Sequence, residues 1–169
     1  MHGAFLGFLW CFTRVFLPSP SGRRRFNVLG AIDAVTKEIV TVMNETTVTA
    51  ETICLLLIEL AKRAEGVAIT VVLDNARYQK CALVQEYAAL LGIELLYLPS
   101  YSPHMNLIER LWRFVRKECL YSRYYESFTD FKAAIEQCLQ TAHQDHREEL
   151  ETLLAWKFQS FEKVQILAV

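Results

Sequence analysis

Two acidic residues stand in segments whose pattern could support metal-dependent chemistry. Asp74 ends the apolar run in "VVLDNARYQK", and Glu109 lies one turn into the helical pattern of "SPHMNLIERLWRFVRK". Carboxylates held on rigid elements are the hard oxygen ligands that Mg²⁺ and Mn²⁺ require. In open α/β sheets, ligand sites gather outside the carboxyl ends of strands, which is where Asp74 would lie. The two carboxylates could share divalent cations if the fold brings them together.

Each carboxylate also has an ordinary structural explanation. Asp74 followed by Asn75 is common turn chemistry. With Asn106 as N-cap, Glu109 falls at the third helical position and would complete a capping box. An ion pair between Glu109 and Arg113, four residues apart on the helix, would be a surface interaction. Taken singly, both acids are better explained by local structure, so the functional hypothesis depends on their combination.

The chain has 169 residues, 53% of them apolar, and a net charge of −1. This composition predicts one compact globular domain, and any affinity for nucleic acid must come from local basic patches. Two such patches exist, Arg23–Arg25 in a turn and the group Arg110, Arg113, Arg116 and Lys117 beside Glu109. Arg24 and the helical group are therefore candidate phosphate contacts. The alternative for each is a solvated surface residue.

Five scattered cysteines without a CxxC pair indicate neither a disulfide framework nor a zinc site, and they favour a reducing compartment. The apolar stretch Ala4–Phe12 is too short to span a bilayer and lacks the basic start of a signal peptide. We therefore expect a cytoplasmic protein, associated with the nucleoid when it is bound to DNA, and no membrane partner.

The elements that must position the two acids follow from periodicity, caps and turns. Strands are predicted at 26–33, 38–43, 67–74 and 93–98, and helices at 50–64, 80–91, 107–119, 127–143 and 148–156. The first two strands form a predicted hairpin, and the near-continuous apolar run at 67–74 indicates a strand covered on both faces. The order predicts an α/β fold, a mixed sheet flanked by helices, in a single domain over 1–169.

In combination, the two acids resemble the pattern of the DDE/D transposases, above all the bacterial insertion-sequence branch of the mariner-type superfamily. The resemblance is carried by "PSPSGRRRFNVLGAI", "LDNARYQK" and "IELLYLPSYSPHMNLIERLWRFVRK", with 34 residues between Asp74 and Glu109. It covers nearly the whole chain. It implies a ribonuclease H-like fold, a two-metal Mg²⁺ or Mn²⁺ site held in part by Asp74 and Glu109, and cleavage and transfer of DNA strands. DNA, as transposon ends and target, is the implied partner.

The family's pattern includes a further carboxylate, an Asp on the first strand of the fold, and the resemblance places that strand ahead of Met1. We therefore expect a partial catalytic domain that lacks its first strand and the family's N-terminal helix-turn-helix region, with catalysis impaired or absent. Asp33 is the nearest substitute for the third ligand, but its position at the end of a hairpin strand favours a turn residue. A sheet edge exposed by a missing strand would promote a homodimer.

Two alternatives to an active transposase domain stay open. A non-catalytic DNA-binding or oligomerising remnant of the same ancestry would need no metal. An unrelated α/β phosphohydrolase would normally place His or Lys residues around Asp74, and the sequence has no such constellation there.

Overall fold

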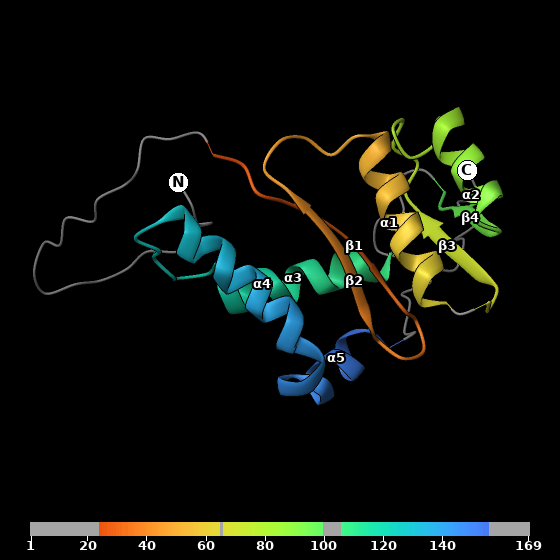
Figure 1. Ribbon diagram of the computed structural model, residues 1–169. Helices are drawn as coiled ribbons and strands as arrows, with labels where there is room; N and C mark the ends of the chain where they lie inside the picture. Colours follow the sequence, from red (N-terminus) through yellow and green to blue (C-terminus); the bar gives the residue numbers. More distant parts are fainter. Residues whose placement is uncertain (1–23, 65, 100–105, 156–169) are drawn as a thin grey trace, which may run out of the picture.

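A computed structural model describes residues 24–64, 66–99 and 106–155. Its elements are β1 (Asn27–Ile32), β2 (Ile39–Asn44), α1 (Ala50–Arg63), β3 (Ile69–Leu73), α2 (Ala82–Leu90), β4 (Ile93–Tyr97), α3 (Leu107–Cys119), α4 (Phe128–Asp145) and α5 (Arg147–Leu153) (Figure 1). Each predicted helix and strand in these ranges is present. The N-terminal apolar stretch, Arg23 of the first basic patch and the C-terminal end of the last predicted helix lie outside the described residues.

The four described strands form two pairs rather than one continuous sheet. β1 and β2 form the predicted antiparallel hairpin, in which Ile32 pairs with Ile39. β3 and β4 are parallel neighbours joined by α2, which is the right element for a parallel connection. Within the described part of the chain, no ladder joins one pair to the other. The mixture of parallel and antiparallel pairing is as predicted, but it is distributed over two small sheets.

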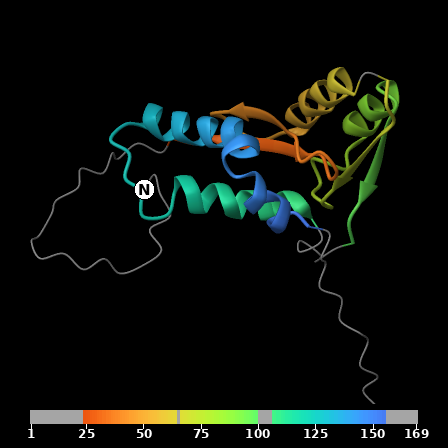
Figure 2. The same ribbon diagram turned by 90° about the horizontal axis from the view of Figure 1, so that it is seen from below.

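The hairpin lies between two hydrophobic cores, one on each face. Val28 and Ile32 pack with α3, α4 and α5, whereas Leu29 packs with α1, α2, β3 and β4. Side chains alternate between the faces of a strand, so consecutive residues of β1 contribute to different cores. Figures 1 and 2 show the same division, with α1 and α2 beside β3 and β4 and with α3 to α5 on the other side of the hairpin.

α3 approaches the hairpin closely at one residue that has no side chain. A Cβ atom added to Gly30 of β1 would lie 2.9 Å from Cη2 of Trp112 on α3. Such a distance is shorter than carbon atoms adopt in packed interiors, where optimal contacts lie at about 3.5–4.0 Å. Glycine at this position therefore permits the indole ring to lie against the strand. This contact helps to determine how closely α3 packs on the hairpin.

The expectation that the strand after residue 67 is covered on both faces is wrong. Val71 and Leu73 of β3 are buried, but Val72 is 44% exposed, and Leu96 of β4 is 52% exposed. α1 and α2 pack against one face of the pair, and the opposite face carries exposed side chains. An apolar run is compatible with either arrangement, because β-branched residues are favoured in strands whether one face is buried or both.

Two cysteines of the described ranges pack as small hydrophobic residues. Cys54 and Cys119 are buried, and the four cysteines in the described ranges are free thiols. The Cys119 thiol on α3 lies within hydrogen-bonding reach of Cys138 on α4, and this hydrogen bond lowers the pKa of Cys119. No described helix is both long enough and apolar enough to cross a membrane.

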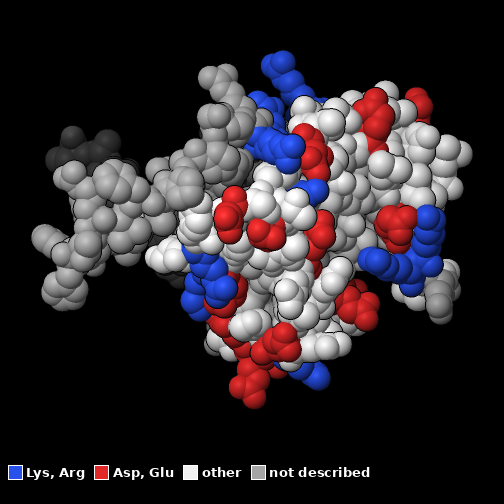
Figure 3. All heavy atoms as spheres, turned by 60° about the vertical axis from the view of Figure 1, so that its left-hand side comes forward, with Lys and Arg blue, Asp and Glu red and all other residues white. Residues whose placement is uncertain are grey.

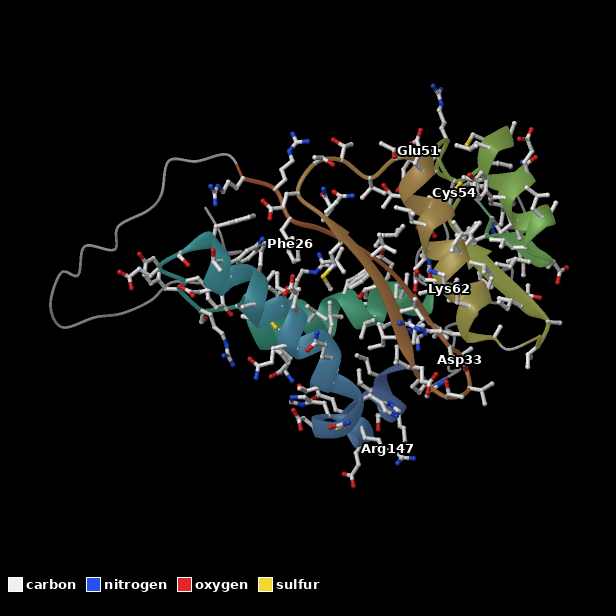
Figure 4. All side chains as sticks on the ribbon, in the orientation of Figure 1. Phe26, Asp33, Glu51, Cys54, Lys62 and Arg147 are labelled. Carbon is white, nitrogen blue, oxygen red and sulfur yellow. The ribbon has the colours of Figure 1, made fainter. Side chains whose placement is uncertain are left out.

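Asp33 is a turn residue at the tip of the hairpin (Figure 4). Its Oδ1 accepts hydrogen bonds of 2.7 Å from the backbone amides of Val35 and Thr36. This Asx-turn geometry is what a strand-end Asp provides when it closes a hairpin. Asp33 therefore has a structural role that accounts for its carboxylate, which agrees with its sequence interpretation as a turn residue.

Asp33→Ala is expected to destabilise the protein in a pH-dependent manner. The hydrogen bond from the Thr36 amide, the largest influence, holds the pKa of Asp33 below its ordinary value of 3.8. A carboxyl group with a depressed pKa stabilises the fold above its unfolded pKa, and this stability is lost as the pH falls through the folded pKa. The difference in Tm between wild type and Asp33→Ala should therefore be full at neutral pH and shrink below pH 3.8. Asp33→Asn, which keeps the acceptor without the charge, should show less of this pH dependence, and a Tm difference independent of pH in Asp33→Ala would contradict the prediction.

Candidate catalytic site

Asp74 follows β3 at its carboxyl end, where the loop is tied to β4. The amide of Leu98 donates to the carbonyl of Leu73 at 2.8 Å, and the side-chain Nδ2 of Asn75 donates to the carbonyl of Leu98 at 2.6 Å. These bonds hold the backbone on both sides of Asp74 against the neighbouring strand. Asp74 itself is half-buried. The carboxylate is thus presented from a braced strand end rather than from a free turn.

Asn106 connects this strand end to the helix that carries Glu109. It is the N-cap of α3, and its side-chain Oδ1 accepts a hydrogen bond of 3.3 Å from the amide of Ile108. Its side-chain Nδ2 donates to Oδ1 of Asp74 at 2.9 Å. The two motif segments are therefore in direct contact. Glu109 lies three residues after Asn106, which corresponds to about 4.5 Å along the axis of an α-helix.

Glu109 makes neither of the local interactions that its position allowed. Asn106 is the N-cap as predicted, but the carboxylate of Glu109 does not complete a capping box with it. Within the described residues, Glu109 also forms no ion pair with Arg113. The side chain is half-buried on the first turn of α3. Within the described part of the chain, neither ordinary explanation therefore holds for this acid.

The basic side chains of α3 have separate roles. Nη1 of Arg110 donates to the carbonyls of Leu153 and Ala155, at 3.2 Å and 2.8 Å, where α5 ends. Nζ of Lys117 pairs with Glu149 at 2.8 Å, and this hydrogen bond raises the pKa of Lys117. Both residues therefore contact α5, and their role as phosphate contacts stays a prediction.

The other two basic residues of the predicted patch are exposed. Arg113 and Arg116 lie on the outer face of α3, and Nε of Arg116 donates to the carbonyl of Trp112 in the preceding turn. Arg24 is exposed as well, with its guanidinium carbon 5.3 Å from the centroid of the Phe128 ring. On the face shown in Figure 3, Lys and Arg side chains alternate with Asp and Glu rather than forming one basic surface.

Lys80 and Tyr97 support the loop after Asp74. Nζ of Lys80 donates to Oδ1 of Asn75 at 3.1 Å and lies 5.2 Å from the centroid of the Tyr97 ring. The hydroxyl of Tyr97 donates to the carbonyl of Gln79 at 3.1 Å, which closes the loop onto β4. Because Asn75 already bonds the end of β4, these contacts form one braced unit around Asp74.

The residue that sequence reasoning missed is Asn106 as a partner of Asp74. The sequence identified it only as an N-cap, a role that Ser and Asp fill about equally well. Asn differs from those residues because its amide also carries two N–H donors. The choice of Asn at the cap three residues before Glu109, a candidate metal ligand, was the available signal.

The described residues do not contain a three-ligand metal site. No group of three or more His, Cys, Asp or Glu side chains in these ranges could hold a metal ion together. Asp74 and Glu109 are brought to adjoining segments, whereas Asp33 is committed to the hairpin turn. The fold thus places the two candidate ligands on segments that a hydrogen bond joins.

Comparisons with known proteins place this arrangement in context. A family model described as DDE superfamily endonuclease matches residues 13–132, well over half of the chain. The match includes both Asp74 and Glu109. A search of curated protein sequences finds no match.

Solved structures with the same fold include viral and transposon proteins. A chain of the simian T-cell lymphotropic virus intasome has a TM-score of 0.56 and 15% identity, covering 83% of this chain and 53% of that one. The catalytic core domain of BIV integrase has a TM-score of 0.52 and 15% identity, with 71% and 83% covered. The Mos1 strand transfer complex has a TM-score of 0.52 and 17% identity, with 93% and 50% covered. These are ribonuclease H-like catalytic cores, and the chain spans about half the length of the first and third.

Proposed function

Because this chain belongs to the DDE superfamily endonucleases, we propose that it forms a transposase catalytic domain for divalent-metal-dependent cleavage and transfer of DNA strands. We further assign it to insertion-sequence transposition in the mariner-type superfamily, on the motif segments around Asp74 and Glu109. The observation that carries the proposal is the hydrogen bond from Asn106 to Asp74, because it joins the strand-end acid to the helix of the second acid.

The donor set suits Mg²⁺ or Mn²⁺. Both ions prefer oxygen ligands, and Asp74 and Glu109 offer carboxylate oxygens from a strand end and a helix turn. Within the described residues, Oδ2 of Asp74 and both oxygens of Glu109 have no hydrogen-bond partner, so they are open to a cation. In this type of site, bound divalent ions stabilise the attacking and leaving oxygens at a phosphodiester. Asp74 and Glu109 would hold them, each from a backbone that the fold fixes.

The remaining residues bind and orient. The braced loop of Asn75 and Lys80 keeps Asp74 at the end of β3. Exposed Arg113 and Arg116 lie on the helix of Glu109 and would contact the DNA backbone, where positive charge displaces counterions without reading sequence. DNA is thus the proposed partner. We also propose that the chain forms a homodimer. Because the proposed reaction takes place on DNA, we propose that the protein works in aqueous solution.

A second function is favoured by one observation. No group of three or more potential metal ligands forms within the described residues, and two ligands hold a cation more weakly than three. A chain with this set could act as a DNA-binding or oligomerising remnant that does not cleave. The two functions differ in whether Asp74 and Glu109 bind a divalent ion.

Asp74→Asn and Glu109→Gln are each expected to reduce Mn²⁺ affinity to the level of non-specific binding by the other carboxylates of the chain. Each change removes an anionic ligand and keeps side-chain size, so the fold should remain and Tm should change little. Mn²⁺ binding is measured by electron paramagnetic resonance of the free ion, and nicking is assayed on supercoiled DNA with Mg²⁺ or Mn²⁺. The matched control is Glu86→Gln, which alters an exposed carboxylate on α2.

The outcomes separate the two functions. Binding and nicking that both require Asp74 support a catalytic domain. Binding without nicking supports a metal-holding site that needs another carboxylate for catalysis. Equal Mn²⁺ affinity in wild type and Asp74→Asn would contradict the metal site and leave the DNA-binding remnant.

A further inference from the structure

The amide of Asn106 performs two different tasks with its two ends. Oδ1 caps α3 by accepting from the amide of Ile108 at 3.3 Å, and Nδ2 donates to Oδ1 of Asp74 at 2.9 Å. Asn106 is only 9% exposed, so both bonds are shielded from competing water. A side chain used at both ends cannot rotate without losing one of these bonds. Asn106 therefore fixes the orientation of Asp74 with respect to the axis of α3.

This link reaches Glu109 through a rigid element. Glu109 stands in the first turn of α3, about 4.5 Å along the helix axis from Asn106 at 1.5 Å per residue. The path from one acid to the other is thus a single hydrogen bond and one turn of helix. The alternative connection along the chain passes from β4 through residues 100–105, which lie outside the described ranges.

The chemistry of an amide donor suits this position better than that of a cation. Lys or Arg in the same place would also bond Asp74, but its charge would neutralise the carboxylate and repel a divalent ion. An ionised Asp cap would supply the acceptor for α3 and no donor, and a Ser cap would carry its single hydroxyl donor on a side chain one atom shorter than the amide. A neutral amide orders one oxygen of Asp74 and keeps the negative charge of the site.

We propose that Asn106 is a positioning residue for the divalent-ion site, which holds Oδ1 of Asp74 so that Oδ2 faces the cation at a set separation from Glu109. The inference rests on the proposed function and identifies the residue that organises its two ligands. Asp side chains otherwise turn broadly about the terminal torsion. Asn106 removes that freedom before the ion arrives, and hydrogen-bonding partners of ligands commonly affect metal affinity about 10- to 100-fold.

Asn106→Ser tests the inference because Ser retains the helix cap and lacks the amide donor. We expect Mn²⁺ affinity to fall by roughly 10-fold or more while the cap keeps α3 in place. The control is Asn27→Ser, which removes an amide donor engaged at the same distance, from Nδ2 of Asn27 to Oδ1 of Asn44 at 2.9 Å, on β1. Asn27→Ser should bind Mn²⁺ like wild type even if both variants lose similar stability.

A second measurement uses the wild-type chain and stands even if Asn106→Ser does not fold. Addition of Mg²⁺ should shift the side-chain ¹H–¹⁵N resonances of Asn106, because the ion withdraws electron density from the carboxylate that accepts its hydrogen bond. The shift should be absent in Asp74→Asn. An Asn106 resonance that does not respond at saturating Mg²⁺ would overturn the inference.

Mn²⁺ binding by the variants distinguishes a wrong role for Asn106 from a wrong metal site. If Asn106→Ser binds Mn²⁺ as wild type does, while Asp74→Asn does not bind, the metal site stands and the role of Asn106 is overturned. If the wild-type chain binds no Mn²⁺, the proposed metal function is overturned, and the positioning role falls with it.

Discussion

Gly30→Val is expected to lower the free energy of unfolding by about 1–3 kcal/mol, which is typical of an overpacked interior. The new Cβ would lie 2.9 Å from Cη2 of Trp112 and 3.5 Å from Cγ2 of Thr41, so the indole ring must move. Glycine within a strand is intrinsically unfavourable by roughly 0.5–1 kcal/mol relative to alanine, so the substitution also brings a gain. The clash is larger than this gain and decides the sign. Urea unfolding measured by circular dichroism provides the free energy.

The clash can be separated from the backbone gain by a double-mutant cycle. In a Trp112→Leu background the indole is absent, and Gly30→Val should become neutral or stabilising because only the strand preference remains. Trp112 lies one turn after Glu109 on α3, so the single mutant should also lose Mn²⁺ affinity as the helix moves. A Gly30→Val effect of equal size in both backgrounds would show that Trp112 is not the cause.

Arg110→Met is expected to lower the free energy of unfolding by about 1.5–3 kcal/mol, the range for hydrogen bonds made by charged groups. Its guanidinium donates to the carbonyl of Leu153, an unpaired carbonyl of the last turn of α5, and to that of Ala155, just beyond the C-cap. Met keeps the length of the aliphatic stem, so the loss reports the hydrogen bonds. Leu150 of α5 and the C-cap residue Leu154 belong to the core and are almost fully buried, so release of this helix end exposes apolar surface. Thermal unfolding should show a Tm lower by about 2–4 °C for each kcal/mol.

Arg113→Met is the matched control, with the opposite pattern expected. Arg113 is exposed on the same helix and has no ion-pair partner among the described residues, so its loss should leave Tm nearly unchanged. If it contacts a phosphate, DNA binding should weaken and the dependence of affinity on salt should become less steep. Arg110→Met at a temperature where it is folded should bind DNA like wild type. A large loss of DNA affinity in Arg110→Met alone would reverse the assignment of these two arginines.

Local patterns accounted for most of the secondary structure. α3 occupies the predicted range Leu107–Cys119, because its apolar periodicity begins directly after a strong N-cap residue. The hairpin followed from two short β-branched runs, and α1 and α2 end before Gly66 and Gly92, which both have positive φ. These features depend on neighbours within one or two turns of chain, and such neighbours can be read from a single sequence.

Side-chain partners depended on distances that the sequence does not contain. Glu109 and Arg113 have the spacing of an ion pair, yet they do not form one, and Arg110 turns to a helix end more than forty residues away along the chain. The apolar run of β3 was compatible with burial on one face or both, and the packing of α1 and α2 on one face decided it.

The sequence by itself determined which elements form, which acids end a strand and begin a helix, and to which family their combination is similar. Only the tertiary structure decided that Arg110 caps α5 and that Asn106 joins Asp74 to α3. The physical reason is the range of the interactions. Periodicity and capping act over a few residues, whereas a hydrogen bond of 2.9 Å between residues 32 positions apart exists only after β3 and α3 have packed.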